Sequence, residues 1–169
     1  MKNSLIEKFG YLGICMMMIS FVACAQEKAS PAKTAEGTVN GAKITINYSS
    51  PAVKGRTIWG DLVPYNEVWR AGANEATIFE TSKDIKVEGQ ELPAGKYSFY
   101  IIPGESESTF IFNSQTGQWG TEYDESKDVL RVPVQSQESP SMVERLTYKV
   151  TPTGFEVSWA DGLAKAKIE

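Results

Sequence analysis

Short runs in which apolar and polar residues alternate are the most regular feature of the chain. Residues 43–48 (KITINY) place Ile44, Ile46 and Tyr48 at every second position. Such positions share one face of an extended strand, so this run predicts a strand with one buried face. Comparable runs, several of them rich in β-branched and aromatic residues, follow at 76–81, 85–87, 90–92, 96–102, 109–112, 129–134, 142–150, 155–159 and 163–168.

Turn-forming residues separate many of these runs, for example the Gly and Pro residues at 88–89, 93–95 and 103–104. No long stretch has the apolar period of an α-helix, and only short helical turns are expected, one of them at 122–128. The pattern predicts an all-β fold, an antiparallel β-sandwich or jelly-roll-like single domain over residues 38–169.

The N-terminal residues have the composition of an export signal. Two lysines precede an apolar run at 11–23 that is shorter than the about 20 apolar residues needed to span a bilayer. Two forms of processing remain open, plain cleavage after Ala25 or lipidation of Cys24. We expect a signal peptide or lipoprotein signal at 1–25 and a flexible tether at 26–37. The domain is then periplasmic, secreted, or held at the outer membrane through Cys24.

The composition of the chain excludes several classes of catalytic, metal-binding and nucleic-acid-binding site. The chain contains no histidine, which excludes Ser-His-Asp and Cys-His catalytic units and removes the commonest zinc, copper and iron ligand. Its net charge is −4, and −5 without the first 25 residues, so it has no basic footprint for nucleic acid. We expect no cofactor, no metal centre and no membrane contact other than the possible lipid anchor.

The segment 48–77 is too long and too rich in Trp and Arg for an ordinary connection. It carries six candidate ligand-binding residues, Arg56, Tyr65, Trp69, Arg70, Asn74 and Glu75. Guanidinium and aromatic groups can stack on flat ligands, and the turn at 72–75, where Gly72 or Asn74 could take positive φ, could bind an anion. The alternative is structural, with Arg70 paired to Glu75 or another carboxylate and the tryptophans in the core.

A second cluster, at 117–128, contains Trp119, which would stack on a sugar ring or plug one end of the sandwich. Its acidic residues, Asp124 among them, lack the spacing of a calcium loop and fit better as caps or solvated charges. Glu75 with Asp124 or Asp61 would be the carboxylates of a glycan hydrolase or lyase, if the fold placed them about 5–10 Å apart.

Four pieces of the sequence, SPAVKGRTIWGDLVPYNEVWRAGANEAT, LPAGKYSFYIIPG, IFNSQTGQWG and YDESKDVLRV, resemble the bacterial family known as domain of unknown function 2911. The resemblance runs from about residue 44 to residue 150. It implies an exported β-sandwich of the Bacteroidetes type, with no activity or ligand assigned. We therefore expect a non-catalytic binding or structural module that takes a small anionic or carbohydrate ligand; the carboxylate-dependent enzyme is the alternative.

Overall fold

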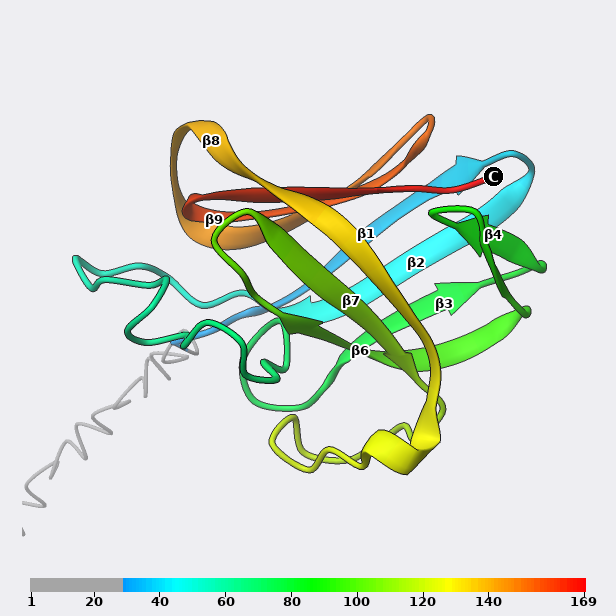
Figure 1. Ribbon diagram of the computed structural model, residues 1–169, viewed down its shortest axis with the longest axis horizontal. Coiled ribbons are helices and arrows are strands. Elements are labelled where there is room, and N and C mark those ends of the chain that lie inside the picture. Colours follow the sequence, from blue (N-terminus) through cyan, green and yellow to red (C-terminus); the bar gives the residue numbers. More distant parts are fainter. Residues whose placement is uncertain (1–28) are drawn as a thin grey trace, which may run out of the picture.

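Antiparallel strands make up most of residues 29–169, the part of the chain that a computed structural model describes (Figure 1). The only helical element of this part is one 3-10 turn, η1 (Glu125–Lys127), inside the predicted interval 122–128. The all-β antiparallel prediction is confirmed. The strands are β1 (Ala32–Val39), β2 (Ala42–Ser49), β3 (Thr77–Thr81), β4 (Ile85–Val87), β5 (Gln90–Leu92), β6 (Gly95–Ile102), β7 (Glu107–Asn113), β8 (Asp128–Thr151) and β9 (Gly154–Lys167).

Seven strands form one sheet in the order β1-β2-β3-β6-β7-β8-β9, and β4 pairs with β5 in a separate hairpin. The large sheet nearly closes on itself, because β1 returns beside the far end of β8. A side chain at Gly37 of β1 would lie 2.8 Å from Val150 Cγ1 of β8. The β4–β5 hairpin is tied to the C-terminus, where Val87 bridges Ile168.

Alternation in β2 predicts its buried face correctly. Ile44 and Ile46 are fully buried and Tyr48 nearly so, while the residues between them are exposed or half-buried. The sheet wraps around a core of phenylalanines from β3, β6, β7 and β9, which includes Phe79, Phe99 and Phe155. Burial of these rings, together with the buried aliphatic residues around them, stabilises the fold.

The predicted tether at 26–37 is wrong for its second half. Residues 32–37 belong to β1 and pair with β2 in register from Ala32–Ser49 to Val39–Ala42. One face of β1, from Ala32 to Thr38, is exposed, and the other face carries only the small residues Ala35 and Gly37 before the buried Val39. The strand therefore lacks the large apolar residues at every second position that would reveal it in the sequence. The predicted signal at 1–25 and the first residues of the tether lie outside the described residues.

The last four predicted runs are two long bent strands. Residues 129–134 and 142–150 both belong to β8, and residues 155–159 and 163–168 fall almost entirely in β9. The register of the pair shifts twice, between Glu138 and Val143 and again before Thr147. β9 folds back on itself near Ala160, which has φ of +53°, so that Ile168 N donates to Thr153 O at 2.9 Å. Bulges of this kind bend a strand and change the direction in which its side chains point.

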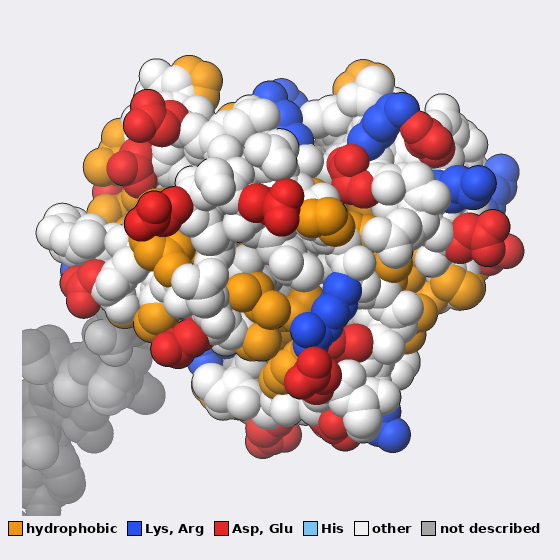
Figure 2. Space-filling view, in the orientation of Figure 1, with side chains coloured by type: hydrophobic (Ala, Val, Ile, Leu, Met, Phe, Trp, Pro, Cys, Tyr) orange, Lys and Arg blue, Asp and Glu red, His pale blue; other side chains and the backbone are white. Residues whose placement is uncertain are grey.

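Charged groups of both signs are interspersed on the surface. On the face in Figure 2, Lys and Arg side chains lie close to Asp and Glu side chains rather than in a stripe. Residues 29–169 contain no helix that is long and apolar enough to cross a membrane.

Alkaline pH should destabilise this fold. Burial, the largest cause in each case, raises the pKa of several tyrosines: that of Tyr123 to about 12, that of Tyr148 well above its ordinary value, and also those of Tyr48, Tyr97 and Tyr100. A phenol whose pKa is higher in the folded chain gives stability that is complete below its unfolded pKa of about 10 and is lost as pH rises through the folded pKa.

The urea midpoint should therefore fall between about pH 10 and pH 12, and the fall should be shallower in Tyr148→Phe. Tyrosinate absorbance of the folded protein should rise above pH 10 together with the loss of structure. A complete titration near pH 10 with the fold intact would contradict this expectation.

Candidate functional site

The crossover between β2 and β3, residues 50–76, is ordered by pairing with two distant strands. Val53 N donates to Glu144 O and Leu146 N donates to Pro51 O, so its first part adds to β8 at a point where β8 leaves β9. Farther along, Trp69 exchanges two backbone hydrogen bonds of 2.8 and 2.9 Å with Ile101 of β6. These contacts hold a loop without regular structure across one end of the sheet.

The turn after Trp69 is fixed from the core. Ala71 has φ of +51°, and its carbonyl accepts hydrogen bonds from Tyr148 Oη at 2.7 Å and Thr77 Oγ1 at 3.0 Å. A Cβ at Gly72 would lie 2.7 Å from Thr77 Oγ1, so this position needs glycine for lack of space. Asn74 has the predicted positive φ, +62°, whereas the other residue of this turn with positive φ is Ala71, not Gly72.

Three tryptophans meet beside this turn. Trp69 stacks on Trp159 of β9 with centroids 5.8 Å apart, and Trp59 stands nearly perpendicular to both at 5.7 and 6.2 Å. Trp59 Nε1 donates to Trp159 O at 3.3 Å. Trp159 is 2% exposed, and its own Nε1 has no partner among the described residues.

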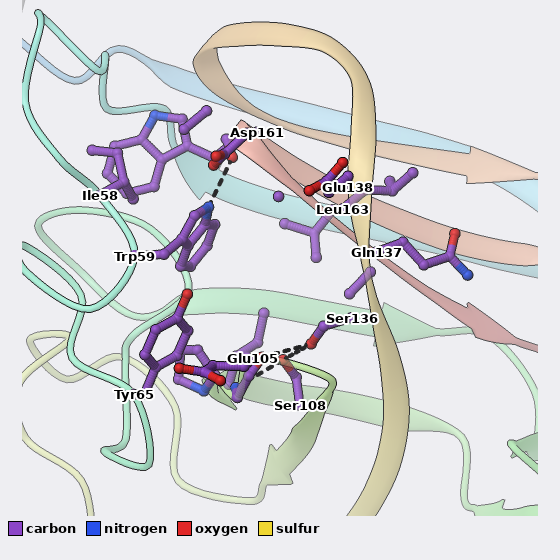
Figure 3. A pocket seen from close by; sticks show the side chains of 18 of the residues that line it. Ile58, Trp59, Tyr65, Glu105, Ser108, Ser136, Gln137, Glu138, Asp161 and Leu163 are labelled. Atoms are coloured by element: carbon purple, nitrogen blue, oxygen red, sulfur yellow. Dashed lines mark hydrogen bonds between the residues drawn. The ribbon is translucent and has the colours of Figure 1, made fainter.

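A hollow of about 570 Å³, which we call the indole cavity, opens on one side of this cluster. Its walls are the three tryptophans, Tyr65, Met142 and Leu163, and three carboxylates, Glu105, Glu138 and Asp161, line it as well. Figure 3 shows Asp161 and Glu138 on one side of the cavity and Glu105 beside Tyr65 on the other. Ser108 Oγ and Ser136 Oγ are hydrogen-bonded to each other at 2.8 Å.

A second hollow of about 730 Å³, the arginine cleft, lies on the other side of the crossover. Its charged lining residues are Lys54, Arg56, Arg70 and Glu67, and Asn74 and Thr121 add further polar groups. Arg56, Trp69 and Trp159 line both hollows, so they form the wall between them. Three cations and one anion surround the cleft, whereas one cation and three anions surround the indole cavity.

The two arginines differ in what they touch. Arg56 is already engaged, since its Nε donates to Val53 O at 3.0 Å and its NH2 to Ala52 O at 2.5 Å. Arg70 makes no hydrogen bond or ion pair through its guanidinium with any residue of the described part. The stem of Arg70 packs on Gly120, where an added Cβ would lie 2.5 Å from Arg70 Cδ.

The predicted ligand-binding residues are only partly brought together. Arg56, Trp69, Arg70 and Asn74 line the arginine cleft, and Tyr65 joins Arg56 and Trp69 at the indole cavity. The structural alternative is half right, because Trp59 and Trp69 do pack against the core. The predicted ion pair of Arg70 with Glu75 or another carboxylate is not formed within the part of the chain that the structure describes.

Glu75 and Trp119 line neither hollow, although they bridge each other across two loops. Trp119 is 47% exposed, so it does not plug the sandwich. Stacking of a flat ligand on its open face stays a prediction.

The carboxylates expected for a hydrolase are also outside both hollows. Asp61 and Glu75 are exposed, and Asp124 caps η1 by accepting from Ser126 N at 2.9 Å and Ser126 Oγ at 2.7 Å. These hydrogen bonds are the main reason that the pKa of Asp124 is lowered. Within residues 29–169, no three His, Cys, Asp or Glu side chains converge as metal ligands would.

The sequence did not single out Trp159 or the three cavity carboxylates, Glu105, Glu138 and Asp161. Trp159 ends an alternating run and is indistinguishable there from a core residue. The dipeptide Asp161-Gly162 after it is a common turn signal, and it marks the corner of β9 that carries the cavity.

Comparison with known proteins gives a family but no function. The family model described as "Protein of unknown function (DUF2911)" matches residues 30–168. Neither the curated proteins nor the solved structures contain a match.

Proposed function

The chain belongs to the DUF2911 family of proteins of unknown function, and from the arginine cleft we propose that it is a non-catalytic binding module for a small anionic ligand. The cell envelope is the proposed location, on the strength of the N-terminal export pattern alone. Lipidation of Cys24 and plain cleavage stay alternatives, which the mass of the mature protein distinguishes.

Arg70 carries the proposal, because its guanidinium has no hydrogen-bond or ion-pair partner within residues 29–169. A half-buried arginine in a folded protein ordinarily has an acidic or carbonyl partner, because its five donors lose water when the side chain is covered. The packing of its stem on Gly120 and the pairing of Gly120 N with Asn74 O at 3.0 Å hold Arg70 in place. A carboxylate or phosphate is the partner whose geometry a guanidinium matches best.

The surroundings of Arg70 favour the same ligand. Lys54 and Arg56 give the cleft an excess of positive charge over Glu67. Trp69 contributes an aromatic wall on which the flat part of an organic acid can stack. A volume of about 730 Å³ falls within the range of small-molecule sites.

Replacement of Arg70 by Gln should weaken anion binding. Titration calorimetry with benzoate, citrate and inorganic phosphate should show binding of at least one of them to the wild-type protein. A hydrogen bond to a charged group contributes about 1.5–3 kcal/mol, so Arg70→Gln should lower that affinity by roughly tenfold or more.

Lys149→Gln is the matched control, because Lys149 is exposed and lies outside both hollows. It removes the same charge and should leave the affinity unchanged. Absence of binding by all three anions, or equal loss in both variants, would refute the proposal.

A further inference from the structure

We propose that the indole cavity is a second ligand site, separate from the arginine cleft, and that it binds a small organic cation with an apolar body, such as a quaternary ammonium compound. The two hollows share a wall but have opposite charge. A ligand that suits one therefore does not suit the other.

The walls of the cavity have the chemistry of a cation site. Indole faces carry negative charge density and attract an ammonium group within about 6 Å of the ring centroid, by about 0.5–2 kcal/mol per ring. Trp59 stands at 87° to Trp69, and both line the cavity together with Tyr65. Methyl groups on a cation pack against such rings without loss of hydrogen bonds.

The charged groups at the indole cavity also favour a cationic ligand. The carboxylates of Glu105, Glu138 and Asp161 make no hydrogen bond or ion pair within residues 29–169, and all three residues are exposed at the edges of the cavity. The opposing cation, Arg56, already donates to Val53 O and Ala52 O. The cavity thus attracts cations and repels the organic acids expected in the arginine cleft.

The two serine hydroxyl groups at the cavity are already engaged with each other and with the backbone. Ser136 Oγ donates to Gly104 O at 2.9 Å, and Ser108 Oγ accepts from Gly104 N at 3.3 Å. Both hydroxyls also contact each other, so the pair is used in joining β7 to β8 (Figure 3).

Backbone features of β9 keep the cavity open. The fold-back at Ala160 brings Asp161 and Leu163 to the rim. At Gly162 a Cβ would lie 2.5 Å from Trp59 Nε1 and 2.7 Å from Trp59 Cε2, so glycine is what allows Trp59 to take its position.

Choline and its uncharged isostere neohexyl alcohol, in which carbon replaces nitrogen, provide the test. Calorimetry and tryptophan fluorescence should show choline binding, at least tenfold weaker binding of the alcohol, and loss of choline affinity as salt is added. The double variant Glu138→Gln, Asp161→Asn should bind choline at least tenfold more weakly.

Glu91→Gln, which neutralises an exposed carboxylate outside both hollows, should bind choline like the wild type. Arg70→Gln should also bind choline like the wild type, and this result would show that the choline site is separate from the anion site. Circular dichroism and thermal unfolding verify that each variant is folded.

Equal affinity for choline and the alcohol would mean a neutral apolar site and would overturn the proposal. Unchanged choline binding by the folded double variant would overturn it too. So would the failure of both choline and the larger benzyltrimethylammonium to bind the wild-type protein.

Discussion

Phe99→Ala should lower the free energy of unfolding by about 3–5 kcal/mol. Phe99 of β6 is fully buried at the centre of the aromatic core. Its ring centroid lies 5.1 Å from that of Phe110, 5.3 Å from that of Phe112 and 5.7 Å from that of Phe155. Removal of the ring leaves a cavity bordered by these three rings of β7 and β9, which cannot all collapse into it.

A loss of this size is a large share of the about 5–15 kcal/mol that stabilises a typical domain. Urea unfolding followed by circular dichroism measures it, with Val129→Ala as control. Val129 is 45% exposed on β8, and its truncation should cost less than about 0.5 kcal/mol. A Phe99→Ala protein within about 1 kcal/mol of the wild type would show that this core is not closely packed.

Local alternation of apolar and polar residues was enough to predict the fold class, but it did not predict β1 or the bends within the long strands. The run around Ile44 and Ile46 has one apolar face, and the structure buries that face. β1 was not predicted because its inward face carries the small residues Ala35 and Gly37 before Val39, so the strand has no run of large apolar residues at every second position. The polar residues between Glu138 and Val143 look like a loop between strands, although they are a bulged corner within β8.

The candidate site depends on pairings that no local pattern contains. Trp69 reaches the cavity because it pairs with Ile101, and the crossover is fixed at its start by the bridge between Ala52 and Arg145. The choice of Arg56, Trp69 and Arg70 from the sequence rested on residue type alone. That Arg56 is engaged follows only from the carbonyls that surround it, and no partner of the Arg70 guanidinium lies within residues 29–169.

Trp159→Ala is expected to destabilise the protein by about 3–5 kcal/mol and to weaken both proposed binding activities. Trp159 is almost fully buried, stacks on Trp69 and supports Trp59 from the corner of β9. Because it lines the indole cavity and the arginine cleft, its truncation opens the wall between them. Choline and benzoate titrations of the variant, where it folds, should both show weaker binding than the wild type.

Trp159→Phe separates the volume of the side chain from its N–H group. The indole Nε1 is buried without an acceptor in the described part, so its removal deletes no hydrogen bond. Trp159→Phe should therefore lower the free energy of unfolding by only about 1–2 kcal/mol, because contact area is lost. The wall between the two hollows should stay closed. If Phe proved as destabilising as Ala in urea unfolding, the indole N–H would have to have a partner, such as a buried water molecule. The wall would then depend on that polar contact rather than on packing.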